Sequence, residues 1–106
     1  MAQIFHYTNR SSFNVINVIH SQQTWTFLAS RPPGEHPMGA YFTNLDQDTL
    51  LLARKLGIPR EKLEFVLCFA DVADLRPLRG DRGRFIFYSP VDYGVEPARQ
   101  IDAGPT

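Results

Sequence analysis

The sequence predicts a small α+β fold in which strands outnumber helices. The chain has 106 residues, which corresponds to one domain and leaves no room for a second. Short aromatic and β-branched runs, separated by turn-forming residues, indicate several strands. Two other segments carry apolar residues at helical spacing. We therefore expect a single domain over residues 1–106, with about two helices.

The first half of the chain begins with a strand and a helix. Residues 4–8 are β-branched and aromatic, as a strand requires. Ser11 and Ser12 are the expected N-caps of the helix that follows. Its apolar positions are Phe13, Ile16 and Ile19 or His20. Residues 25–28 then predict a second strand. Residues 31–37 hold three prolines and a glycine, so we expect a restricted loop that covers a site.

A strand, a helix and a central strand are expected next. Residues 39–43 suit a strand, and residues 44–48 lead into a helix that Gly57 and Pro59 end. The apolar residues of that helix are Leu50, Leu51, Leu52 and Leu56. Residues 63–69 carry too many consecutive apolar side chains for a half-exposed strand. They predict a central strand that is buried on both faces.

The last third of the chain is rich in turns. Residues 76–84 form a basic connection, and residues 85–88 predict a further strand. The tail after Val91 has only scattered apolar residues, so a short strand near Val95 or Ile101 is the most that it predicts.

Composition excludes several classes of protein. A content of 43% hydrophobic and 12% aromatic residues is that of a globular chain. Eleven basic residues balance eleven acidic ones, so nucleic-acid binding would need a local patch. Cys68 has no disulfide partner, and no Cys/His spacing matches a zinc site. The chain shows neither a secretion signal nor a run of about 18 to 20 apolar residues. We expect a cytoplasmic protein, or one delivered into a target cell.

The end of the first predicted strand carries the most informative polar residues. Alternation along a strand directs His6 and Thr8 to one face and Tyr7 to the other. An imidazole and a hydroxyl on one face can hydrogen-bond a ribose diol or an amide. No second ligand is spaced to help His6 bind a metal. This pattern therefore favours nucleotide recognition over metal binding, with a purely structural histidine as the alternative.

The order of two motifs resembles a known family. The chain opens Phe5-His6-Tyr7-Thr8, continues with a helix, and then reads Gly39-Ala40-Tyr41-Phe42-Thr43 followed by the acidic segment Asp46-Gln47-Asp48. This order resembles the HYD1-type branch of the ADP-ribosyltransferase superfamily over about the first half of the chain. The resemblance implies a split β-sheet core with an NAD-binding cleft between two small sheets.

The resemblance also implies roles for individual residues. His6 would hold a ribose of NAD, and the backbone of Tyr7 and Thr8 would grip the nicotinamide amide. Tyr41 would stack on the nicotinamide ring, a contact that contributes roughly 0.5 to 2 kcal/mol. NAD is then the substrate, and no metal is required.

An acidic residue completes sites of this kind, because departure of nicotinamide leaves a cationic sugar. We expect Glu96 in this role, since a late strand could bring it to the cleft. Asp92 and Asp81 are the alternatives, and a solvated carboxylate is an equally good interpretation of each.

Other polar residues have two interpretations each. Arg10 could meet the pyrophosphate of NAD through charge-assisted hydrogen bonds, or be a solvated surface residue. Ser30 and Arg31 could touch the same dinucleotide. A basic cluster could bind nucleic acid or an acidic protein, or be a solvated loop; it consists of Arg76, Arg79, Arg82 and Arg84. Cys68 is expected to be an inert packing thiol.

The leading functional expectation is an NAD-dependent mono-ADP-ribosyltransferase that acts as a toxin or effector. It would transfer ADP-ribose to a macromolecule, or to water when no acceptor is present, which is an NAD glycohydrolase activity. Its partners would be NAD, a macromolecular acceptor that is a protein or a nucleic acid, and a protein that neutralises it; no membrane is involved. A non-catalytic module that binds NAD or ADP-ribose is the first alternative. A ribonuclease that uses His6 with His20 or His36 as acid and base is the second.

Overall fold

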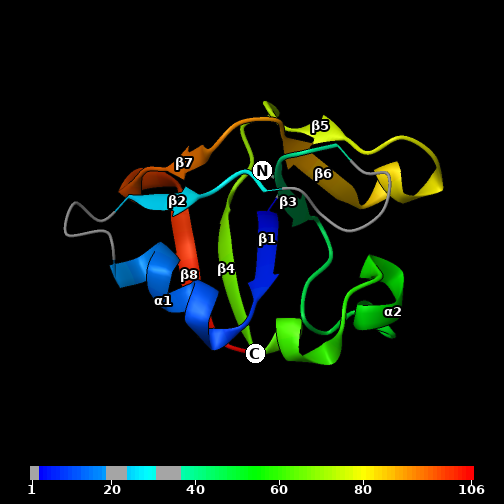
Figure 1. The fold of residues 1–106 in the computed structure, drawn as a ribbon, viewed down its shortest axis with the longest axis horizontal. Helices are drawn as coiled ribbons and strands as arrows, with labels where there is room; N and C mark the ends of the chain where they lie inside the picture. The colour runs from blue at the N-terminus through cyan, green and yellow to red at the C-terminus, as the bar shows by residue number, and fades with distance from the viewer. Residues whose placement is uncertain (1–2, 19–23, 31–36) are drawn as a thin grey trace.

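A computed structural model describes residues 3–18, 24–30 and 37–106 (Figure 1). The described residues form an antiparallel sheet of six strands, a second sheet of two strands and two α-helices. The strands are β1 (Gln3–Thr8), β2 (Trp25–Phe27), β3 (Ala40–Thr43), β4 (Phe65–Ala70), β5 (Arg76–Pro77), β6 (Ile86–Ser89), β7 (Tyr93–Val95) and β8 (Gln100–Pro105). The helices are α1 (Arg10–Val18) and α2 (Leu52–Leu56), with short 3-10 turns η1 (Arg60–Leu63), η2 (Asp81–Arg84) and η3 (Pro97–Arg99).

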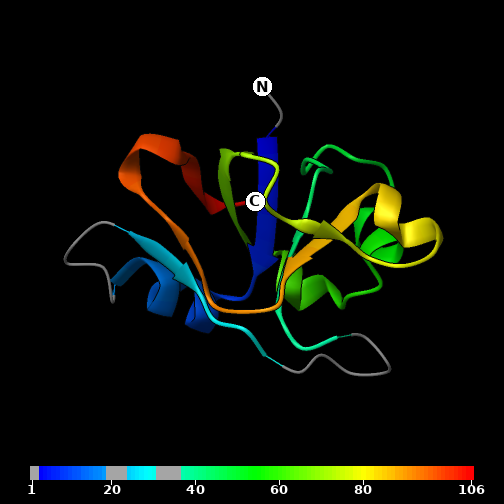
Figure 2. The same ribbon diagram turned by 90° about the horizontal axis from the view of Figure 1, so that it is seen from above.

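The larger sheet has the strand order β5-β6-β3-β1-β4-β8, and the smaller sheet is the pair β2-β7. The small sheet and helix α1 lie on the same side of strands β1 and β4 (Figure 2). Helix α2 lies at the other end of the molecule, next to the turn η1 (Figure 1). No helix among the described residues is long and apolar enough to cross a membrane.

The core lies between the two sheets and is built on aromatic rings. Phe27 of β2 has its ring centroid 5.0 Å from that of Phe42 on β3 and 5.8 Å from that of Phe69 on β4. Tyr93 of β7 closes the group at 5.3 Å from Phe42. Leu67, Phe69 and Val95 are completely buried. Burial of one such side chain contributes about 1.5 to 3 kcal/mol, so this cluster holds the small sheet against the large one.

Strand β1 is paired unequally with its two neighbours. It pairs with β4 along its whole length, from Gln3↔Ala70 to Thr8↔Phe65. With β3 it shares one paired position among the described residues, Phe5↔Thr43. Beyond Phe5 the backbones of β1 and β3 are no longer paired. A side chain can therefore reach the backbone of β3 in the opening between these two strands.

The structure confirms the α+β prediction and most of the expected strands. The expected central strand is β4, where the consecutive residues Leu67, Cys68 and Phe69 are all buried, so both faces are covered. The tail contains more structure than its composition indicated. It forms both β7 and β8, because β7 pairs along its length with β2 and β8 pairs with β4, and such backbone pairing is not visible in the composition.

The helix boundaries differ from the predictions. The cap of α1 is Asn9 and not Ser11 or Ser12, because the Asn9 Oδ1 accepts a hydrogen bond of 2.9 Å from the Ser12 backbone N–H. Residues 19–23, and with them Ile19 and His20, lie outside the described residues, as do residues 31–36 of the expected loop.

Helix α2 is shorter than expected. It has five residues, and the apolar Leu50 and Leu51 precede it with 78% and 58% of their surface exposed. Leu51 has a left-handed backbone (φ 58°), which helix geometry excludes. The predicted end at Gly57 is confirmed, since this residue has φ 68°.

Gly39 allows the backbones of β3 and β6 to approach closely. A Cβ atom at this position would lie 2.5 Å from the carbonyl oxygen of Ser89, a distance that a side chain cannot occupy. Gly39 also exchanges two backbone hydrogen bonds with Ser30, of 2.9 and 3.0 Å. The residue thus connects the segment after β2 to the large sheet.

We predict that Gly39→Ala lowers the free energy of unfolding by about 1 to 3 kcal/mol, because β3 must move away from Ser89. The matched control is Gly104→Ala in β8, where a Cβ would have nothing within 4 Å. This control should change the free energy by less than about 0.5 kcal/mol. Urea denaturation measures both, and equal values for the two variants would contradict the close approach.

Candidate functional site

The imidazole of His6 lies on the inner face of the large sheet. Its ring centroid is 4.8 Å from that of Phe27 and 5.5 Å from that of Phe42, with interplanar angles of 60° and 57°. The side chain is half-buried. Two aromatic rings from two different sheets therefore hold one polar ring between them.

One hydrogen bond fixes the tautomer of this imidazole. The Nδ1 atom of His6 lies 2.8 Å from the backbone carbonyl oxygen of Tyr41. A carbonyl oxygen can only accept, so Nδ1 carries the hydrogen and donates it. In the neutral ring Nε2 is then an acceptor, and it has no hydrogen-bond partner in the described part of the chain. The site thus offers a lone pair at a fixed position.

Burial keeps the His6 ring neutral. Loss of solvent around the imidazole lowers its pKa from 6.5 to about 4, and the positive charge of Lys62 contributes in the same direction. The hydrogen bond to the Tyr41 carbonyl opposes this effect but does not overcome it. At neutral pH the ring therefore carries no charge and retains its acceptor atom.

The opening between β1 and β3 explains why a side chain makes this contact. These strands are paired at Phe5↔Thr43, one residue before His6. As the strands separate, the His6 side chain reaches the carbonyl of Tyr41. The imidazole thus links two strands that the backbone ladder no longer joins.

The ring of Tyr41 does not lie with the imidazole. Side chains alternate along β3, and Phe42 faces His6 and the core, so Tyr41 faces the opposite side of the sheet. The Tyr41 hydroxyl donates a hydrogen bond to the carbonyl of Pro37. Its ring stacks on that of Tyr88, with centroids 5.6 Å apart and an interplanar angle of 19°. The expected convergence of the His6 and Tyr41 rings around one ligand is therefore not found. Tyr41 contacts His6 through its backbone carbonyl, which accepts the hydrogen bond from Nδ1.

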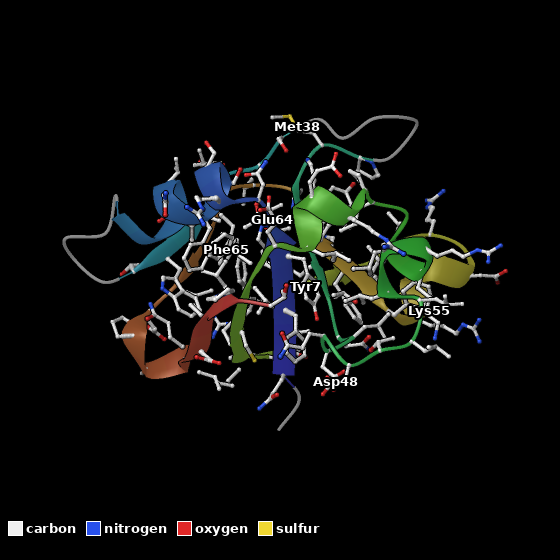
Figure 3. The ribbon with its side chains drawn as sticks, turned by 90° about the horizontal axis from the view of Figure 1, so that it is seen from below. Tyr7, Met38, Asp48, Lys55, Glu64 and Phe65 are labelled. Atoms are coloured by element: carbon white, nitrogen blue, oxygen red, sulfur yellow. The ribbon has the colours of Figure 1, made fainter. Side chains whose placement is uncertain are left out.

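The two residues that follow His6 occupy different faces, as alternation predicts. Thr8 is buried on the His6 face. Tyr7 points to the other face, where its hydroxyl donates a hydrogen bond of 2.8 Å to the Leu45 carbonyl. Figure 3 labels Tyr7 beside β1. Burial and the nearby acidic Asp46 raise the pKa of Tyr7, so this phenol stays protonated.

The expected acid, Glu96, is not brought to His6. The residue is exposed and follows Val95, whose side chain enters the core, so Glu96 points outward. It also lies three positions past Tyr93, or about 10 Å along the strand. Asp81 is in η2, on the connection between β5 and β6 at the edge of the large sheet.

Asp92 is the acidic candidate at the end of β7 nearest to the His6 site. It precedes Tyr93, which pairs with Phe27, the residue whose ring contacts the imidazole. Its Oδ1 accepts a hydrogen bond of 2.7 Å from the Ala29 backbone N–H. Asp92 is exposed, and Oδ2 has no hydrogen-bond partner among the described residues. A carboxylate thus lies at the start of β7, next to the residue pair Phe27–Tyr93 that packs against the large sheet.

Of the two other expected contacts of NAD, Ser30 lies close to this site and Arg10 packs elsewhere. Ser30 is exposed and pairs with Gly39, two residues before Tyr41, so it lies at the border of the site. The Arg10 guanidinium lies 5.7 Å from the centroid of the Phe65 ring, which gives it a packing role at the start of α1. Arg31 lies outside the described residues.

A polar cluster that the sequence did not indicate holds one wall of the core. The Tyr93 hydroxyl donates a hydrogen bond of 2.7 Å to Asp74 and accepts one of 2.7 Å from Arg99. The Arg99 guanidinium also donates to the Ala70 carbonyl and lies over the Phe69 and Tyr93 rings. These residues come from β4, β7, η3 and the segment after β4, so no local pattern could have joined them.

The alternative of two catalytic histidines lies beyond what the structure describes, because His20 and His36 are outside the described residues. Within the residues described, no group of three or more His, Cys, Asp or Glu side chains is placed to hold a metal ion. Comparisons with protein-family models, with curated proteins and with solved structures found no match.

The low pKa of His6 predicts an acid-sensitive fold. Its pKa of about 4 in the folded protein lies below 6.5, so the unfolded chain binds more protons between these values. The stabilisation is complete above pH 6.5 and is lost as the pH falls toward 4, with a slope of up to about 1.4 kcal/mol per unit.

The measurement is urea denaturation at several pH values between 4 and 7, for the native chain and for His6→Gln. Glutamine keeps a donor for the Tyr41 carbonyl but cannot titrate, so this variant should lose the part of the slope due to His6. His20 and His36 contribute equally to both proteins. The same slope in both would show that His6 is not a buried neutral base.

Proposed function

We propose that this chain is an NAD-dependent mono-ADP-ribosyltransferase with an ADP-ribosyltransferase-like split sheet. The observation that carries the proposal is the His6 imidazole, held neutral in the opening between β1 and β3 with Nε2 as a free acceptor. The imidazole belongs to β1 and donates to the backbone of β3, and these are the two strands whose motifs resemble the family. A ribose hydroxyl is the donor that such an atom would bind.

The reaction breaks the bond between the nicotinamide nitrogen and C1′ of the ribose. Its electron pair stays with nicotinamide, which becomes neutral, and the sugar becomes an oxocarbenium-like cation. A nucleophile of the acceptor, or a water molecule when no acceptor is present, then bonds to C1′ and loses its proton. The protein therefore accelerates the reaction by fixing the ribose and by placing negative charge near the cationic sugar.

His6 is suited to fixing the ribose. A neutral ring adds no positive charge beside a developing cation, and its pKa of about 4 keeps it neutral throughout the physiological range. The contacts with Phe27 and Phe42 and the hydrogen bond to Tyr41 restrict the ring to one orientation. Nε2 would accept a hydrogen bond from the ribose in a site partly shielded from water, which strengthens it.

Asp92 replaces Glu96 as the proposed acid. One of its oxygens is held by the Ala29 N–H, so the carboxylate has a defined position, and the other can face the ribose or the acceptor. A carboxylate there would stabilise the cationic sugar and could take the proton that the acceptor loses. Ser30, at the same border, would contact the dinucleotide.

A module that binds NAD or ADP-ribose without catalysis is the second candidate. The observation in its favour is that Asp92 is exposed and Glu96 points outward, so neither carboxylate is desolvated next to His6. An exposed carboxylate stabilises a nearby cation less than a shielded one does. The two candidates share the His6 site and differ in the release of nicotinamide.

The test is incubation with NAD and measurement of free nicotinamide by chromatography. The native chain should release nicotinamide, and His6→Ala should lower the rate at least about tenfold, the effect of one well-placed hydrogen bond. Asp92→Asn removes the charge with little change in shape and should lower the rate about a hundredfold. Glu96→Gln is the matched control and should leave the rate unchanged.

Calorimetric titration with NAD separates the candidates. Binding that is lost in His6→Ala, without nicotinamide release by the native chain, would identify the non-catalytic module. Neither binding nor release would contradict both. A drop in rate for Glu96→Gln but not for Asp92→Asn would return the acid to the position expected from the sequence.

A further inference from the structure

Three side chains form a row across neighbouring strands on the sheet face opposite His6. Tyr41 of β3 pairs with Tyr88 of β6, and Tyr88 pairs with Arg76 of β5. Directly paired residues of antiparallel strands project to the same face, with Cβ atoms about 4.5 to 5.5 Å apart. The two phenol rings are nearly parallel, 5.6 Å apart at 19°. We call Tyr41, Tyr88 and Arg76 the tyrosine–arginine row.

The row belongs to a surface and not to the core. Phe42 and Phe87, the strand neighbours of the two tyrosines, are the residues that pack into the core. Tyr41 and Tyr88 are half-buried, and Arg76 is exposed. Gly39 adds no side chain beside them; a Cβ there would lie 3.1 Å from the Tyr88 ring. Met38, which precedes β3, is 54% exposed (Figure 3).

Positive charge accompanies the row although the chain as a whole is neutral. Residues 76–84 hold four arginines and one aspartate. Arg79 and Arg84, like Arg76, are exposed. The segment begins with the edge strand β5, whose Arg76 pairs with Tyr88, so the charge lies at the edge of the sheet beside the aromatic rings. The flat rings are complementary to the face of a nucleic-acid base, and the arginines beside them are complementary to the phosphates that flank the base.

We propose that the tyrosine–arginine row binds single-stranded nucleic acid. An unpaired base stacks on the aromatic platform, because every base has a flat face, and arginines bind the phosphates on either side. Duplex DNA hides its base faces, so it gains nothing from the rings. An acidic peptide would use the arginines but not the parallel phenols. The combination therefore favours an unpaired strand over both.

This inference does not depend on the proposed transferase. The row is on the face opposite the His6 imidazole, and the phenol rings take no part in the proposed NAD chemistry. A nucleic acid docked there would be held while His6 binds a ligand on the other face. Loss of one activity in a variant can therefore be measured while the other is retained.

The test is fluorescence anisotropy with a 12-nucleotide, fluorescein-labelled single-stranded DNA of mixed sequence. The native chain should bind it, more weakly as salt is raised. Tyr88→Ala should weaken binding at least about tenfold, whereas Tyr88→Phe keeps the ring and should bind like the native chain. Arg76→Ala should weaken binding and reduce the dependence of log K on log salt by about one.

Arg60→Ala is the matched control, since Arg60 is an exposed arginine in η1, away from the row, and should bind like the native chain. Circular dichroism establishes that each variant is folded, and nicotinamide release should be unchanged in Tyr88→Ala. The inference is overturned if the native chain does not bind the DNA, or if Tyr88→Ala binds as well as Tyr88→Phe. A labelled polyglutamate peptide bound as tightly as the DNA, with no effect of Tyr88→Ala, would also overturn it and indicate an acidic protein.

Discussion

The hydrogen bond from His6 Nδ1 to the Tyr41 carbonyl is the contact on which the proposed site depends. It forms where β1 and β3 separate, and it joins the two strands with a side chain. The same bond decides the tautomer of the imidazole, because a carbonyl cannot donate. A single interaction thus links the two strands and leaves Nε2 as an acceptor.

The remaining structure holds that bond in place from three directions. Phe27 and Phe42 fix the plane of the imidazole, and the aromatic core behind them keeps the small sheet against the large one. The close approach of Gly39 to Ser89 positions the beginning of β3. Asp92 joins the end of β7 to the segment after β2 through Ala29. The proposed acid is therefore also a structural residue, which couples the geometry of the carboxylate to that of the sheets.

Local patterns predicted which residues form strands, but not how the strands meet. Alternation correctly separated His6 and Thr8 from Tyr7. It also separates Tyr41 from Phe42, yet which of them shares a face with His6 depends on the pairing of β1 with β3, and spacing along the chain does not contain this pairing. Glu96 and Asp92 both follow the last aromatic strand in the sequence, so the sequence does not separate them. The pairing of β2 with β7 does, because it places Asp92, and not Glu96, next to the residue that pairs with Phe27. The Asn9 cap, by contrast, could have been predicted from the sequence, because asparagine is among the preferred N-cap residues.

Nitrogen NMR of the His6 ring, assigned by comparison with His6→Gln, tests the central claim most directly. The claim predicts a neutral ring at pH 6 with its hydrogen on Nδ1, and an Nε2 signal that shifts when NAD is added. A ring that carries its hydrogen on Nε2, or is charged at pH 6, would contradict the geometry of the site. An Nε2 signal that NAD leaves unchanged would contradict its proposed use.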